Sequence, residues 1–129
     1  MDEAELLIKE AENKLSAAKL LLENGMYSDA VSRAYYSMHY SARAILSLKK
    51  IYPKTHKGII GKLGIEFVKH GIVEDYYIKA ISTARESRER ADYGIGYRFT
   101  KEEAEDIVEE AEKFLEMARK VLSNLKEEK

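Results

Sequence analysis

Arg33 and His39 are separated by five residues in a stretch that has a helical pattern. An arginine that holds a phosphate and a histidine that moves a proton are the minimum for RNA cleavage without a metal ion. In that reaction the ribose 2′-hydroxyl attacks the adjacent phosphate. The pair therefore predicts a candidate catalytic site. The alternative is that His39 is a packed, neutral histidine, because helical geometry places it about 120° around the helix from Arg33, beside apolar residues.

A second candidate site is the segment Lys54-Thr55-His56-Lys57. Thr55 is a plausible N-cap, and the free backbone N–H groups at a helix start favour an anion. We expect Lys54 and His56 to lie close to Arg33, where His56 would be the alternative proton carrier. The other interpretation is a capped, solvated helix start with no ligand.

The helix that carries Arg33 and His39 is predicted over residues 28–49, with Ser28 as its N-cap. One face is an apolar core stripe. The opposite face combines two arginines, two tyrosines and two serines with no acid: Arg33, Tyr36, Ser37, Tyr40, Arg43 and Ser47. Such a face suits contact with phosphate, base or protein, so we predict that Tyr36, Tyr40 and Arg43 bind a ligand. The alternative is that this face packs on a neighbouring helix or a second subunit.

The remaining elements follow from helical periodicity and capping signals. We predict helices over residues 3–23, 55–70, 73–90 and 101–125, with Asn24-Gly25 ending the first and Thr100 to Glu103 forming a capping box before the last. Gly58, Gly61 and Gly64 recur every three residues, which predicts the close approach of another backbone. The arginines near residue 88, including Arg85, Arg88 and Arg90, are expected to guide an RNA backbone.

These elements predict an all-α fold. We expect an antiparallel up-and-down bundle of four long helices plus one short helix, in one domain spanning residues 1–129. No strand pattern is visible. Connections of a few residues make neighbouring helices antiparallel.

The composition narrows the functional classes. The 129 residues contain no cysteine and three histidines, and no metal-binding spacing occurs, so we expect neither a metal site nor a cofactor. No apolar run reaches membrane-spanning length, and the first residues are acidic, so a soluble cytoplasmic protein without a membrane contact is expected. A net charge of −1 argues against broad nucleic-acid binding, so any RNA or nucleotide contact requires a local basic patch.

Several separated strings resemble one family: SRAYYSMHYSARAIL, PKTHKGII, FVKHG, RESRERADYG and FTKEEAEDIVEEAEKF. They are similar to the HEPN (higher eukaryotes and prokaryotes nucleotide-binding) domain family, and more narrowly to its stand-alone prokaryotic branch. The resemblance implies a five-helix bundle that pairs into a symmetric homodimer. It also implies an Arg-x4–6-His motif, found in many members that act as metal-independent ribonucleases and often as toxins. Other members work with a minimal nucleotidyltransferase that neutralises them, and still others have no catalysis.

On this chain the motif corresponds to Arg33 and His39. The pattern of the narrower branch, Tyr-Tyr-x-Met-Phe-His, places the histidine one position later, where this chain has Tyr40. Two hypotheses follow. The first is a dimeric module that binds a nucleotide or a nucleotidyltransferase partner, in the manner of a toxin–antitoxin pair. The alternative is a metal-independent RNA endonuclease that uses Arg33 with His39 or His56.

Overall fold

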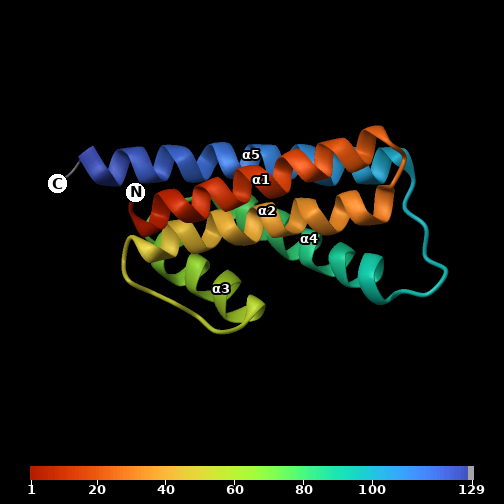
Figure 1. The fold of residues 1–129 in the computed structure, drawn as a ribbon. Helices are drawn as coiled ribbons and strands as arrows, with labels where there is room; N and C mark the ends of the chain where they lie inside the picture. The colour runs from red at the N-terminus through yellow and green to blue at the C-terminus, as the bar shows by residue number, and fades with distance from the viewer. Residues whose placement is uncertain (128–129) are drawn as a thin grey trace.

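The computed structural model describes residues 1–127, and within that range the chain is entirely helical with no strand. Five α-helices follow one another: α1 (Glu3–Glu23), α2 (Tyr27–Ser47), α3 (His56–Leu63), α4 (Asp75–Tyr93) and α5 (Lys101–Glu127). A π-helical segment, η1 (Gly64–Val68), continues α3. The predicted all-α bundle of four long helices and one short helix is confirmed (Figure 1).

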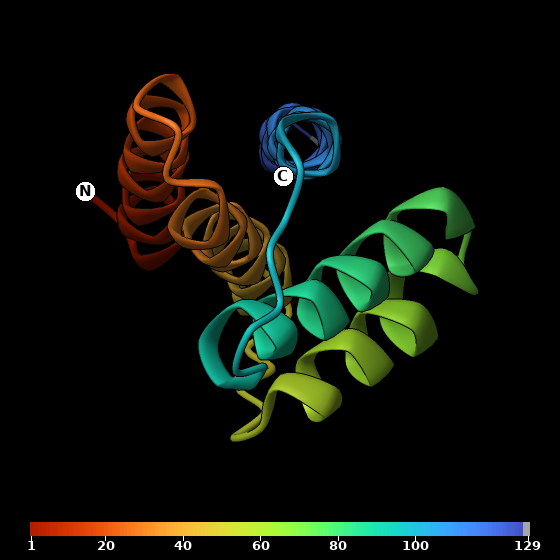
Figure 2. The same cartoon turned by 90° about the vertical axis from the view of Figure 1, so that its right-hand side faces the viewer.

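Helix α2 is the central element of the bundle. It contacts α1, α3, α4 and α5, and twelve of its 21 residues are buried. Figure 2 shows α1, α2 and α5 nearly end-on, whereas α3 and α4 run across the view as a second layer against α2. The largest buried side chains of α2 are Tyr35, Met38, Ile45 and Leu46. Each contributes about 1.5–3 kcal/mol through removal of apolar surface from water, so the residues of α2 are held in fixed positions.

Local capping interactions set several helix ends as predicted. Asn24 ends α1, and Gly25 adopts a φ of 74°, which favours glycine. At the start of α5 the Thr100 N–H donates to the Glu103 carboxylate over 2.9 Å, and the Glu103 N–H donates to the Thr100 hydroxyl over 3.1 Å. This reciprocal pair is the predicted capping box.

The predicted start of the second helix is wrong. Helix α2 begins at Tyr27, with Met26 rather than Ser28 at the cap position and no side-chain cap bond. Tyr27 packs against a small cluster formed by Val31, Phe99 and Ala104. This tertiary contact brings Tyr27 into the helix and removes Ser28 from the position where its hydroxyl would cap. Helix α4 likewise runs over Asp75–Tyr93 rather than 73–90.

The predicted role of the three glycines is also wrong. A Cβ placed on Gly61 would have no atom within 4 Å, and one on Gly64 would only reach Ile78 Cδ1 at 4.0 Å. At Gly58 the neighbours are local, with Thr55 Oγ1 at 2.9 Å. No backbone from another element approaches these glycines. Their low helix propensity instead coincides with the change to π geometry at Gly64.

Candidate functional site

Two histidines from different helices meet where α2, α3 and α4 converge. The rings of His39 and His56 have centroids 4.6 Å apart with an interplanar angle of 33°. Tyr35 and Tyr36 of α2 surround them, with centroids 5.3 Å from one another and about 6 Å from the His39 ring. We call the residues Tyr35, Tyr36, His39, His56 and Arg88 the histidine cluster.

Arg88 of α4 completes this cluster. Its guanidinium carbon lies 5.5 Å from the Tyr35 ring centroid and 5.6 Å from the Tyr36 centroid. Its side chain is only 11% exposed, and it pairs with Asp92 over 3.4 Å. The Arg88 Nε is buried without a hydrogen-bond partner among the described residues. A guanidinium held over aromatic faces keeps its charge while losing part of its hydration, so Arg88 supplies a fixed positive charge beside the two imidazoles.

The local sequence explains how each helix presents its part of the cluster. Tyr35 and His39 are four residues apart and Tyr36 and His39 are three apart, so the three side chains lie on one side of α2. The Thr55 hydroxyl accepts from the Gly58 N–H over 2.9 Å, which fixes the start of α3 and makes His56 its first residue. The predicted N-cap role of Thr55 is confirmed.

Burial and nearby positive charges keep both imidazoles neutral. Burial lowers the pKa of His39 to about 4, with further contributions from His56, Arg43 and Arg88. The His39 Nδ1 is buried and has no hydrogen-bond partner among residues 1–127. Burial likewise lowers the pKa of His56, assisted by the charges of Arg88 and Arg85. At neutral pH each ring can therefore accept a proton.

Tyr35 orients the His56 ring. Its hydroxyl is hydrogen-bonded to the His56 Nδ1. The phenol is 1% exposed, and burial raises the pKa of Tyr35 to about 12, so it stays protonated. A protonated phenol donates to a neutral imidazole nitrogen, so the His56 Nδ1 acts as acceptor and the proton of the ring sits on Nε2.

A pocket of about 360 Å³ opens beside the histidines. Both His39 and His56 line it, together with Arg43, Lys54 and the wall formed by Ile51, Tyr52 and Pro53. Glu3 is the carboxylate in the lining. The pocket therefore offers two proton acceptors and two cations to an anionic ligand, which fits the chemistry of a phosphate group.

The structure brings together most of the residues that the sequence singled out, although not around Arg33. Tyr40 lies 5.3 Å from His39 between ring centroids, and the Arg43 guanidinium lies 5.3 Å from the Tyr40 centroid. Arg85 pairs with Glu89 over 3.7 Å and acts on the pKa of His56. Within residues 1–127, Arg33 is exposed, and no ion pair or ring contact joins it to the histidine cluster.

Lys54 and His56, which we expect beside Arg33, line the pocket together with His39, whereas Arg33 is not in its lining. The cation that the structure places against the histidines is Arg88, which the sequence indicated only as a guide for an RNA backbone. The sequence does not single out Tyr35 as a functional residue, and its hydrogen bond to His56 was not predicted. The spacing of Tyr35 and His39 on one helix side was visible in the sequence, whereas the approach of α3 and α4 was not.

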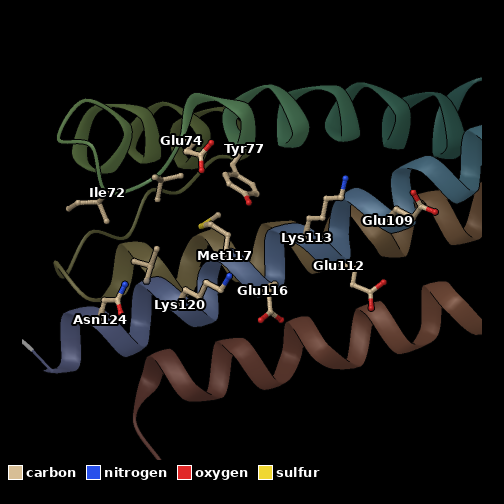
Figure 3. A pocket seen from close by; sticks show the side chains of 12 residues that line it. Ile72, Glu74, Tyr77, Glu109, Glu112, Lys113, Glu116, Met117, Lys120 and Asn124 are labelled. Carbon is tan, nitrogen blue, oxygen red and sulfur yellow. The ribbon is translucent and has the colours of Figure 1, made fainter.

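A larger cavity lies elsewhere, between α5 and the start of α4. It measures about 540 Å³, and Figure 3 shows Glu74 and Tyr77 facing Lys113 and Met117 across it. Its lining contains no histidine. Part of its charge is also neutralised locally, since Lys113 pairs with Glu110 over 3.8 Å. Because this cavity offers no imidazole to a ligand, we place the candidate site at the histidine cluster.

No group of three or more potential metal ligands occurs among the described residues. Nor is any helix within residues 1–127 long and apolar enough to cross a bilayer.

The fold and the site define a helical-bundle protein with a cationic, histidine-lined pocket between its first, second and third helices. The sequence matches the HEPN domain over residues 4–121, so this chain belongs to the HEPN family. The family predicted from the sequence strings is confirmed.

The relatives are prokaryotic proteins of similar length. A protein of Methanocaldococcus jannaschii named "Putative toxin" is 44% identical over 124 residues, covering 96% of this chain and 92% of that protein. A second protein of the same organism and name is 38% identical over 120 residues, covering 93% and 82%. A UPF0332 protein of Thermotoga maritima is 35% identical over 130 residues, covering 98% of both chains. These matches agree with the predicted stand-alone prokaryotic branch.

Proposed function

We propose that this chain is a toxin-type RNA endonuclease that works in the cytoplasm without a metal ion, at the histidine cluster. One observation carries the proposal: two neutral imidazoles, which both line a cationic pocket, lie 4.6 Å apart beside a guanidinium whose side chain is only 11% exposed. The printed names of two relatives, each a "Putative toxin", support the same class.

The chemistry follows from the protonation states. The His39 imidazole removes the proton from a ribose 2′-hydroxyl, whose oxygen then bonds to the adjacent phosphorus. Arg43 and Lys54, the two cations that line the pocket, neutralise the charge that develops on the phosphate oxygens, and Arg88 adds a fixed positive charge beside the histidines. An anionic phosphate in the pocket raises the pKa of His56, so this ring carries a proton that it transfers to the departing 5′-oxygen. The P–O5′ bond breaks, and the products are a 2′,3′-cyclic phosphate and a 5′-hydroxyl.

Cleavage of a labelled RNA pool in the presence of EDTA tests this proposal. We expect the wild type to cleave, and we expect Arg88→Ala and His56→Gln each to lower the rate by at least about 100-fold, the usual effect of losing a charge-stabilising or acid–base group. Arg119→Ala is the matched control, because Arg119 lies on α5 and pairs with Glu12 far from the pocket. Cells that express the wild type should stop growing, and growth should recover only in cells that express one of the two site variants.

Two results would contradict the proposal. The first is that the purified wild type leaves RNA intact in the presence of EDTA and that its expression does not slow growth. This result would exclude the endonuclease activity. Loss of cleavage in Arg33→Ala, with full activity in Arg88→Ala, assigns the phosphate contact to Arg33 across a dimer instead.

A second candidate function is a dimeric module that binds a nucleotide or a minimal nucleotidyltransferase without cleaving RNA. The surroundings of the histidines support it, because no carboxylate within the described residues is hydrogen-bonded to either ring. An imidazole without such a partner is a weaker base, which favours binding over cleavage. In this case calorimetry should detect nucleotide binding that Lys54→Gln weakens, while EDTA-treated protein leaves RNA intact.

A further inference from the structure

We propose that a groove on the outer side of α3 binds a second nucleotide of a single-stranded RNA whose reacting phosphate sits at the histidine cluster. The inference rests on the proposed RNA-directed function and names its substrate as single-stranded. The groove measures about 500 Å³ and is formed by Ile51, Tyr52, Pro53, Gly58, Gly61, Lys62 and Ile65. We call it the α3 groove.

The α3 groove is continuous with the histidine pocket. Three residues, Ile51, Tyr52 and Pro53, line both cavities. An RNA strand that runs from the histidines across these three residues therefore enters the α3 groove directly. A polynucleotide contacts a protein as a string of repeated units, so two adjoining cavities are what successive nucleotides require.

The walls of the groove offer an apolar surface that no residue within 1–127 covers. Tyr52 is 58% exposed and Ile65 is 56% exposed. Between them Gly61 leaves open space where a side chain would otherwise stand. A hydrogen bond to the Glu3 carboxylate raises the pKa of Tyr52 and ties its ring to α1. A fixed, exposed aromatic ring is a stacking platform for a nucleobase.

The charge around the groove is that of a polyanion site. Residues 27–72 carry eight lysines and arginines but only two acids, Asp29 and Glu66. Glu66 is engaged by Lys49 over 3.7 Å, whereas Lys50, Lys54 and Lys62 are exposed. Although the whole chain has a net charge of −1, this third of it is basic, and it forms the local patch that RNA binding requires. An aromatic platform beside these cations favours RNA over an acidic peptide, and only an unpaired strand exposes its base faces.

Fluorescence anisotropy with a labelled 2′-O-methyl oligonucleotide of ten residues tests binding in the groove. No cleavage can occur in this assay, because a methylated 2′-oxygen cannot attack the phosphate. Gly61→Leu fills the α3 groove, and we expect it to weaken binding roughly tenfold, the effect of losing one stacked base. Gly61→Ala is the matched control, since a single methyl group meets no atom within 4 Å and leaves the groove open. Equal melting temperatures, or higher ones, in both variants exclude misfolding.

The charge contribution is measured separately. Lys62→Gln should reduce the slope of log affinity against log salt by about 0.7, the value for one phosphate contact on a single strand. Lys79→Gln is the control, because Lys79 pairs with Asp75 over 3.4 Å on α4 and lines neither cavity; its slope should match the wild type.

Three results would overturn the inference: no binding of the oligonucleotide by the wild type, unchanged affinity in Gly61→Leu, or equal displacement by a polyglutamate peptide. The proposed function fails in a different way. If Gly61→Leu weakens binding while no RNA is cleaved, the α3 groove stands and the endonuclease does not. If RNA is cleaved and Gly61→Leu binds normally, the endonuclease stands and the groove does not.

Discussion

The histidine pair owes its chemistry to the positions of two imidazoles that resist protonation. Rings 4.6 Å apart would repel each other if both were charged, and Arg88 adds a third positive charge over the neighbouring tyrosines. Burial of His39 opposes protonation further. The cluster is thus stable only while the imidazoles are neutral, and an incoming anion relieves the same repulsion. Stability and ligand binding are therefore linked through the charge of this site.

The depressed pKa of His39 makes the stability of the fold depend on pH. A histidine with a pKa of about 4 in the folded chain and about 6.5 when unfolded binds fewer protons in the folded state between these values. The stabilisation is complete above pH 6.5 and is lost as the pH falls towards 4. After allowance for solvent screening of a partly exposed ring, we expect a loss of about 1–2 kcal/mol.

Urea unfolding of the wild type and His39→Gln at pH 7.5, 5.5 and 4.5 measures this effect. The free energy of unfolding of the wild type should fall more steeply with decreasing pH than that of the variant, since both share all other titrating groups. Parallel pH dependences in the two proteins would show that His39 titrates normally in the folded state.

Among the elements, α3 combines two glycines with opposite relationships to their surroundings. Gly58 sits against the Thr55 hydroxyl that caps the helix, whereas Gly61 faces open space on the outer side. Glycine in a helix interior costs about 0.5–1 kcal/mol relative to alanine. Retaining glycine at the open position therefore sacrifices helix stability without any gain in internal packing, which agrees with a binding role for that surface.

Alanine substitutions at two glycines should shift stability in opposite directions. Gly61→Ala should raise the free energy of unfolding by about 0.5–1 kcal/mol, because its φ is helical and its Cβ meets no atom. Gly71→Ala should lower it by about 1 kcal/mol, because Gly71 has a φ of 74°, a conformation that strains residues with a Cβ. Thermal unfolding of both variants measures the difference. Destabilisation by Gly61→Ala would show that α3 needs that glycine for folding.

The elements whose ends are fixed by local chemistry could be predicted from the sequence. The bounds of α1, the Thr55 cap of α3 and the box at Thr100 all depend on residues within four positions of each other. The start of α2 could not be predicted, because burial of Tyr27 against Phe99 depends on contacts 72 residues apart. The predicted role of the glycines was wrong for a similar reason, because open space around a residue is a property of the assembled bundle.

At the scale of the whole molecule, the candidate site joins three segments that no spacing rule connects. Arg33 was chosen because it lies on the same helix as His39, and a pattern in one helix is all that a single sequence displays. His56 and Arg88 reach the same point only because α3 and α4 both pack on α2. Lys54 and Arg43, which the sequence predicts as ligand-binding residues, line one pocket with His39, and Arg33 is not part of its lining.

Arg33 remains available for a second subunit, and we propose that the chain is a homodimer. This arginine is exposed on α2, and within residues 1–127 no acid pairs with it. A guanidinium without an internal partner among the described residues suits an interface, where a carboxylate of another chain can accept hydrogen bonds from two of its nitrogens. Light scattering after gel filtration should give twice the 14.8 kDa mass of one chain. The melting temperature should rise with protein concentration, because association stabilises only the folded state.

Arg33→Ala should shift the equilibrium towards monomer, whereas Arg119→Ala, whose partner Glu12 lies in the same chain, should not. A mass of one chain at every concentration would show that the exposed face of α2 serves a different partner.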